Sequence, residues 1–143
     1  MRSIMGKGAA AALVLLALIA PVAALDTVSC KDAKGEIAFT YVTGPALVQP
    51  VLSVEMQLTD DFGLSTDAGH PDHDGEYVSA GFIGDDVEGG TVSWKDEDGR
   101  EHQAMSFRIG RVYEAQRAQV GGVVAVAGGG LWTVSCRSSD LGL

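Results

Sequence analysis

The residues of this sequence that are best suited to chemistry lie in one stretch, residues 60–76. Its second half contains His70, Asp72, His73, Asp74 and Glu76. Carboxylates at alternate positions beside a glycine can direct their oxygens to one point, and calcium binds six to eight oxygen ligands. Imidazoles beside a carboxylate suit zinc or copper instead. The stretch therefore predicts a calcium or transition-metal site, and the alternative is a solvated acidic turn that holds no metal.

Catalytic arrangements are not favoured. A serine hydrolase of the α/β type places its nucleophile in a Gly-x-Ser-x-Gly elbow, which the sequence lacks. Among nineteen acidic residues, pairs of carboxylates arise by chance, so they do not indicate a glycosidase. The glycine clusters lack the lysine of a phosphate-binding loop. We therefore expect no enzyme activity, no catalytic residues and no cofactor other than the metal considered above.

The chain has two cysteines, Cys30 and Cys136, each within an alternating segment of the kind that forms a strand. In an oxidising compartment an isolated pair typically forms a structural disulfide. Closing a loop of 105 residues would stabilise the fold by roughly 4.7 kcal/mol in the chain-entropy treatment. We predict a disulfide that joins the first strand to the last and leaves no thiol for catalysis.

The first 24 residues have the three parts of a secretory signal peptide. Arg2 and Lys7 precede an apolar run over residues 9–20, and a small-residue site ends at Ala24. The run is shorter than the roughly 20 apolar residues that cross a bilayer, so an uncleaved anchor is the less favoured alternative. We predict cleavage after Ala24, one domain over residues 25–143, a periplasmic or secreted location, and no membrane insertion after cleavage.

The chain is acidic, with a formal net charge of −9 that becomes −11 without the leader. Between Glu55 and Glu101 there are fourteen acidic residues against only Lys95 and Arg100. This balance argues against binding to nucleic acid or to an anionic membrane. It favours a basic protein partner that meets one negative end or face. The alternative is that the acids are solvated in loops between strands.

Apolar and polar residues alternate along most of the chain after residue 25, as in half-buried strands. The clearest segment is 52–58, in which Leu52 starts the apolar face. Segments 37–41 and 78–82 follow the same pattern. A hairpin is expected over residues 92–109, turning at an Asp-Gly pair, and another over residues 123–136, around three glycines.

Since no helical pattern is long enough for a crossover between parallel strands, we expect an all-β antiparallel sandwich or small barrel. Residues 59–75 have loop composition throughout. Residues 110–121 are ambiguous, and we favour a loop or a short helix near 110–119. Trp94 and Trp132 alternate with polar neighbours, which is typical of rings that pack in the core or at its rim.

Three further residues form a candidate binding patch. Tyr113 lies near Arg111 and Arg117. Tyrosine and arginine are enriched among the residues that anchor protein interfaces. The alternative is ordinary packing at the rim of the core.

The plan of leader, small β-domain and one disulfide between the end strands resembles that of the small periplasmic inhibitors of lysozyme. Those inhibitors carry a Ser-Gly loop followed by an aromatic residue, and the nearest segment here, residues 74–77, has no serine before Gly75. The resemblance therefore implies a plan and carries over no functional residue. We expect a non-enzymatic β-domain that binds a basic protein or serves as a cell-envelope accessory. The alternatives are a metal-binding domain and an inhibitor of a lysozyme-like glycosidase.

Overall fold

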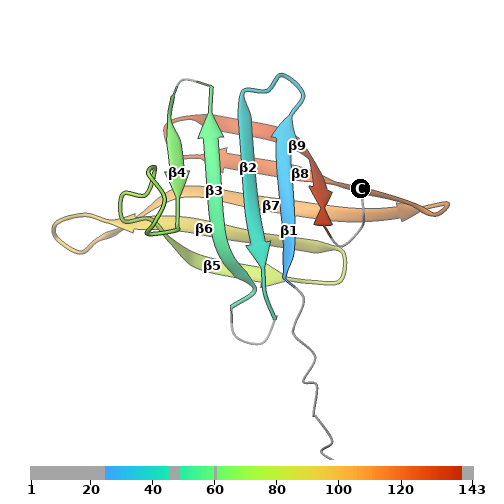
Figure 1. Cartoon of the computed structure of the whole chain (residues 1–143), viewed down its shortest axis with the longest axis horizontal. Helices are drawn as coiled ribbons and strands as arrows, with labels where there is room; N and C mark the ends of the chain where they lie inside the picture. Colours follow the sequence, from blue (N-terminus) through green and yellow to red (C-terminus); the bar gives the residue numbers. More distant parts are fainter. Residues whose placement is uncertain (1–24, 46–48, 60, 140–143) are drawn as a thin grey trace, which may run out of the picture.

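The computed structural model describes residues 25–45, 49–59 and 61–139, which form one antiparallel sheet of nine strands (Figure 1). The predicted leader lies outside the described residues. The sheet order is β4-β3-β2-β1-β9-β8-β7-β6-β5, and this confirms the predicted all-β antiparallel fold. The strands are β1 (Asp26–Asp32), β2 (Ile37–Thr43), β3 (Val51–Leu58), β4 (Gly63–Ser65), β5 (Tyr77–Ile83), β6 (Val87–Lys95), β7 (Glu101–Glu114), β8 (Arg117–Val126) and β9 (Gly130–Ser138).

The sheet curls until its ends approach, so the fold is a nearly closed barrel (Figure 1). β4 pairs with β3 only at residues 55–57, and β5 contacts β3 as well. At this seam a Cβ added to Gly81 would lie 3.1 Å from the Cβ of Val51. The missing side chain at Gly81 therefore lets β5 come close to β3.

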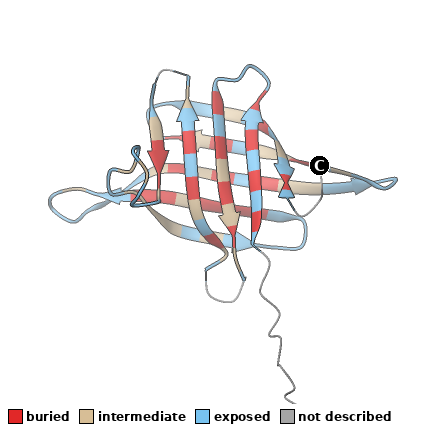
Figure 2. Ribbon diagram, viewed as in Figure 1, coloured by how far each residue is buried: buried red, intermediate tan, exposed pale blue. Residues whose placement is uncertain are grey.

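The core consists of the side chains that point into the barrel, and burial alternates along the strands (Figure 2). Ile37, Phe39 and Tyr41 are buried on β2, as the alternation predicts. Two of their rings pack against Phe107 of β7, with centroid distances of 5.3 Å for Phe39 and 4.6 Å for Tyr41. Rings from opposite walls thus fill the barrel.

The predicted disulfide is confirmed. Cys30 and Cys136 are directly opposite each other on β1 and β9, with their Cα atoms 4.0 Å apart. β1 and β9 are neighbours in the sheet, so the bridge joins the first strand to the last. Cys30 is buried, and a buried disulfide is compatible with an oxidising compartment.

The expected loop or helix near residues 110–119 is instead a β-hairpin. β7 continues to Glu114 and β8 begins at Arg117. Ala115 and Gln116 form the turn with φ of 44° and 68°, the pattern of a tight hairpin turn that usually contains glycine or asparagine. Because neither glycine nor asparagine occupies these two positions, no turn was predicted here. The described residues contain no α-helix, and none that is long and apolar enough to cross a membrane.

Three exposed side chains depart from the expected alternation. Leu52, Phe82 and Trp94 are all exposed, although each belongs to the apolar set that the pattern assigns to the core. Each lies on a strand whose pairing shifts register, in the β2–β3, β5–β6 and β6–β7 ladders respectively. The extra residue is Leu52 itself in β3 and Ser79 in β5, and an extra residue reverses which face the later side chains of its strand occupy. In the β6–β7 ladder the extra residue lies on β7, so it does not reverse the face of Trp94 on β6. Trp132 does pack against the core, as expected.

The stretch of residues 59–75 is not wholly irregular. It contains the short strand β4, which pairs with residues 55–57 of β3. Leu64 on this strand is buried in the core. The remainder of the stretch consists of turns and bends in its described part.

Candidate functional site

Acidic residues gather at one end of the barrel, which we call the acidic end and define as residues 61–76 and 95–101. It carries nine carboxylates against Lys95 and Arg100, a net charge of −7. The two segments lie at the same end of the molecule (Figure 1). Tyr77 links them, because its hydroxyl donates to Glu101 and its ring centroid lies 5.9 Å from the Lys95 ammonium.

An exposed aromatic pair stands at the base of this acidic hairpin. Trp94 and His102 are directly opposite on β6 and β7, and their rings stack at 4.6 Å with 21° between the planes. His102 Nε2 lies 2.8 Å from Asp96 Oδ2, and this hydrogen bond holds the pKa of Asp96 below its usual range. Trp94 remains 40% exposed. The indole is therefore held at the surface among carboxylates, where it can meet a Lys or Arg side chain.

The five candidate metal ligands make local contacts in the loop before β5. His70 Nε2 lies 3.1 Å from Glu55 Oε1, and His70 Nδ1 accepts from the Asp72 amide at 3.1 Å. The carboxylate of Asp72 covers Gly63.

The other two acids and the second histidine form a separate group. His73 Nδ1 donates to the carbonyl of Ser65 at 2.8 Å. Glu76 Oε2 accepts from the Asp74 amide at 2.6 Å and lies 4.0 Å from His73 Nδ1. Within the described ranges, no three His, Cys, Asp or Glu residues lie close enough to hold a metal ion. The metal site therefore stays a prediction.

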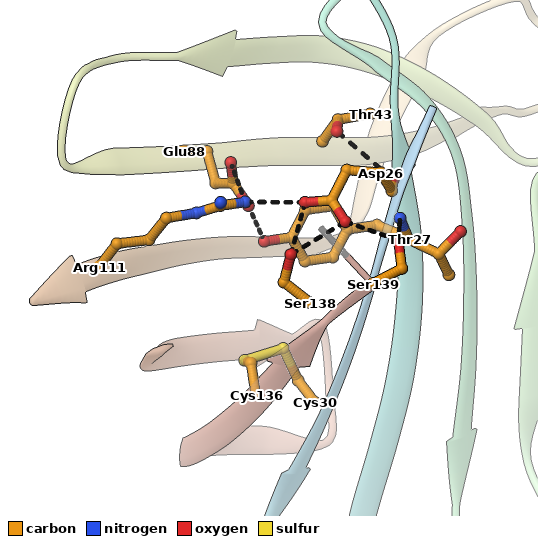
Figure 3. Close-up of polar contacts among 10 residues, drawn as sticks. Asp26, Thr27, Cys30, Thr43, Glu88, Arg111, Cys136, Ser138 and Ser139 are labelled. Carbon is orange, nitrogen blue, oxygen red and sulfur yellow. Dashed lines mark hydrogen bonds and ion pairs between the residues drawn. A yellow bond between two sulfur atoms is a disulfide. The ribbon is translucent and has the colours of Figure 1, made fainter. Parts of the chain in front are cut away.

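The candidate patch of Arg111, Tyr113 and Arg117 is not brought together as one surface. Tyr113 is 60% exposed and Arg117 is exposed, both near the tip of the β7–β8 hairpin. Arg111 instead points into the end of the barrel, and its side chain is only 17% exposed. Its Nη2 lies 3.0 Å from Asp26 Oδ2 and 3.1 Å from Glu88 Oε1 (Figure 3).

This ion cluster is buried and its polar atoms are satisfied. Asp26 and Glu88 are 5% and 4% exposed. The hydroxyl of Ser138 donates to both oxygens of Asp26 at 2.9 and 2.8 Å, and Ser139 adds a bond of 2.8 Å (Figure 3). Within the described residues no buried side-chain polar atom lacks a partner. The cluster joins β1, β6, β7 and β9 and therefore acts in stability.

Tyr41 completes the cluster from β2. Its hydroxyl donates to Glu88, and burial followed by this carboxylate raises its pKa far above the usual range. Burial tends to lower the pKa of Arg111, but the hydrogen bonds to Glu88 and Asp26 outweigh it and raise the pKa. Tyr41 and Arg111 therefore keep their protons at neutral pH. The cluster borders a groove of about 340 Å³ that Ile83, Val87 and Tyr113 also line.

No family model, curated protein or solved structure matches this chain. Its function must therefore be argued from the chemistry of the described residues. The acidic end with its exposed tryptophan is the candidate functional surface.

Sequence reasoning missed Asp26 and Glu88. A signal for Asp26 was present, because it shares the inward phase of Val28 and Cys30 on β1. A carboxylate in that phase has to find a cation or hydrogen-bond donors inside the fold. Arg111 lies two residues after Ile109, in the inward phase of β7. The ion pair between Asp26 and Arg111 could therefore have been predicted if β7 had been expected to continue beyond residue 110.

Proposed function

We propose that the protein is an exported, non-enzymatic β-barrel that binds a basic protein partner through its acidic end. The observation that carries this proposal is Trp94, an exposed tryptophan fixed by His102 within a surface of net charge −7. Tryptophan is enriched among residues that dominate binding energy at interfaces. Its ring face also attracts Lys and Arg side chains.

The carboxylates of the acidic end and the indole of Trp94 have separate physical roles. The carboxylates steer a cationic partner toward the acidic end and raise the association rate, an effect that salt screens. The indole supplies apolar contact after docking, which slows dissociation. Because the stacked His102 and its bond to Asp96 already hold the ring, little side-chain entropy is lost on binding.

Export places the protein and its partner in one oxidising compartment. The predicted leader and the disulfide between Cys30 and Cys136 support this location. A lysozyme-like glycosidase is one basic partner of this class, as the resemblance in plan suggests. The role of a cell-envelope accessory protein is compatible with the same surface.

The test is the affinity of the purified protein for defined basic proteins, a lysozyme and a cytochrome c, measured by calorimetry at low and moderate salt. Glu97→Gln with Asp98→Asn removes two charges from the exposed turn of the acidic end. We expect weaker binding and a shallower salt dependence. Trp94→Ala should weaken binding by about tenfold and leave the salt dependence unchanged, because it removes no charge.

The matched control is Asp85→Asn with Asp86→Asn. It removes the same charge from the exposed β5–β6 turn, which lies at the opposite end of the barrel (Figure 1). Binding should be nearly unaffected. If both double variants weaken binding equally, the attraction depends on total charge alone and the acidic end is not the site.

A further inference from the structure

A second surface, which carries two cations, lies on the outer face of β9, β1, β2 and β3. It is a groove of about 630 Å³. The strand register explains the hollow, because Ser29 is opposite Thr40 and Lys31 is opposite Ala38 on the exposed side of the sheet. Small side chains in the middle, with longer ones on both sides, leave a depression. We call this surface the outer groove.

Two cations face the outer groove from neighbouring strands. Arg137 of β9 is opposite Ser29, and Lys31 of β1 follows two residues later on the same exposed side. Neither has an ion-pair partner among the described residues. Other cations do, since Lys34 pairs with Glu36 at 3.9 Å. In a chain with nineteen acids and a net charge of −9, two neighbouring unpaired cations indicate a place for an anionic group.

The opposite end of the groove has the opposite charge. Glu55 of β3 is opposite Thr40, and Thr40 is opposite Ser29, so one row of the sheet runs from Arg137 to Glu55. This row crosses three strand spacings, about 14 Å. Its floor offers the hydroxyls of Ser29 and Thr40, which are 3.1 Å apart, beside the methyl group of Ala38.

We propose that the outer groove binds the carboxyl-terminal end of a short extended peptide. The terminal carboxylate lies between Lys31 and Arg137, where a guanidinium can hold both of its oxygens. An extended chain of four residues spans about 13 Å, which brings a free amino terminus to Glu55. The ligand is thus a dipolar molecule of tetrapeptide length, a free peptide, because a longer protein chain has no amine at this distance from its carboxyl terminus. The proposal does not depend on a basic partner at the acidic end, although Glu55 also lies 3.1 Å from His70 of that end.

The probe is tetra-alanine, titrated into the purified ¹⁵N-labelled protein and followed by amide chemical shifts. We expect saturable shifts at residues 29–31, 38–40 and 135–137. Amidation of the carboxyl terminus should weaken binding by about tenfold or more, because it removes the charge that the two cations meet. Equal affinity for the acid and the amide would overturn the proposal.

Variants locate the two ends of the ligand. Lys31→Gln with Arg137→Gln should weaken binding as much as amidation does, and Arg137→Lys, which keeps the charge without the planar fork, should weaken it less. Arg117→Gln is the matched control, since Arg117 is also exposed and without an ion-pair partner among the described residues. If Arg117→Gln has the same effect, the binding is nonspecific attraction and the outer groove is not a site.

The amino-terminal end of the ligand is tested through Glu55. Glu55→Gln should weaken binding of the free peptide and leave its N-acetylated form unaffected. N-acetylation should weaken binding by about tenfold or more, and an acetylated peptide that binds within about threefold of the free one would overturn the proposal. Inorganic phosphate that produces the same shifts at equal affinity would reduce the site to a plain anion site and refute the peptide.

Discussion

Replacing Arg111 by methionine tests the ion cluster at the end of the barrel. The change keeps a long apolar side chain but removes the guanidinium that contacts both Asp26 and Glu88. Asp26 retains the hydroxyls of Ser138 and Ser139, whereas Glu88 retains, within the described part of the chain, only that of Tyr41. Glu88 is therefore the carboxylate that is destabilised more by the loss of the guanidinium.

The magnitude follows from burial. Both carboxylates are at most 5% exposed, so they cannot recover their hydration when the guanidinium is removed. Breaking a buried ion pair by removing one partner costs about 3–5 kcal/mol. A domain of this size has a total stability of about 5–15 kcal/mol. The unfolding midpoint should fall by about 10–20 °C.

The assay is urea unfolding followed by tryptophan fluorescence, with the disulfide intact. Adding Glu88→Gln to Arg111→Met should recover about half of the loss, since it removes the uncompensated charge. Arg117→Met is the control and should change the stability by less than about 0.5 kcal/mol. A loss below about 1 kcal/mol in Arg111→Met, or strictly additive losses in the double variant, would refute the reasoning.

Three further predictions concern the remaining features. Asp32 accepts amide hydrogen bonds from Ile37 and Lys34, which lower its pKa. The stabilisation of the fold by Asp32 is therefore present above about pH 4 and is lost as the pH falls through the folded pKa. Asp32→Asn should make the thermal unfolding midpoint depend less on pH in this acidic range. Replacing Cys30 and Cys136 together by alanine should lower the unfolding free energy by about 2–5 kcal/mol in urea without changing the far-UV circular dichroism at low temperature. If residues 60–76 bind a metal, calcium or zinc at a hundred times its Kd should stabilise the fold by about 2.7 kcal/mol and a chelator should reverse this, whereas an unmoved midpoint with both ions rejects the site.

The sequence predicted the fold class and the disulfide because their signals are local and redundant. Segment 37–41 alternates without interruption, and its three large apolar side chains are buried. The disulfide required only that two cysteines lie in the end strands of one sheet. The predictions of the fold class and the disulfide therefore hold even where the face assigned to an individual residue is wrong.

Errors of register account for most of the predictions that were wrong. A bulge inserts one residue without a glycine or proline to mark it, so alternation that is followed straight through the segment assigns Leu52 and Phe82 to the wrong face. The alternation also gave no sign that Trp94, on which the proposed function depends, is 40% exposed, and no extra residue of β6 accounts for this. For the β7–β8 hairpin the missing signal was in the turn, where Ala115 and Gln116 adopt positive φ without glycine.

The two proposed surfaces adjoin along the β3–β4 ladder, and an ion pair also links them, between His70 of the acidic end and Glu55 of the outer groove, 3.1 Å apart. A peptide amine that reaches Glu55 would share this carboxylate with His70. A basic protein on the acidic end approaches the same carboxylate from the side of residues 61–76. Because Glu55 can satisfy only a limited number of donors, occupation of either surface at this point should weaken the other through competition for one carboxylate. The carboxylate of Glu55 is thus shared by the outer groove and the acidic end.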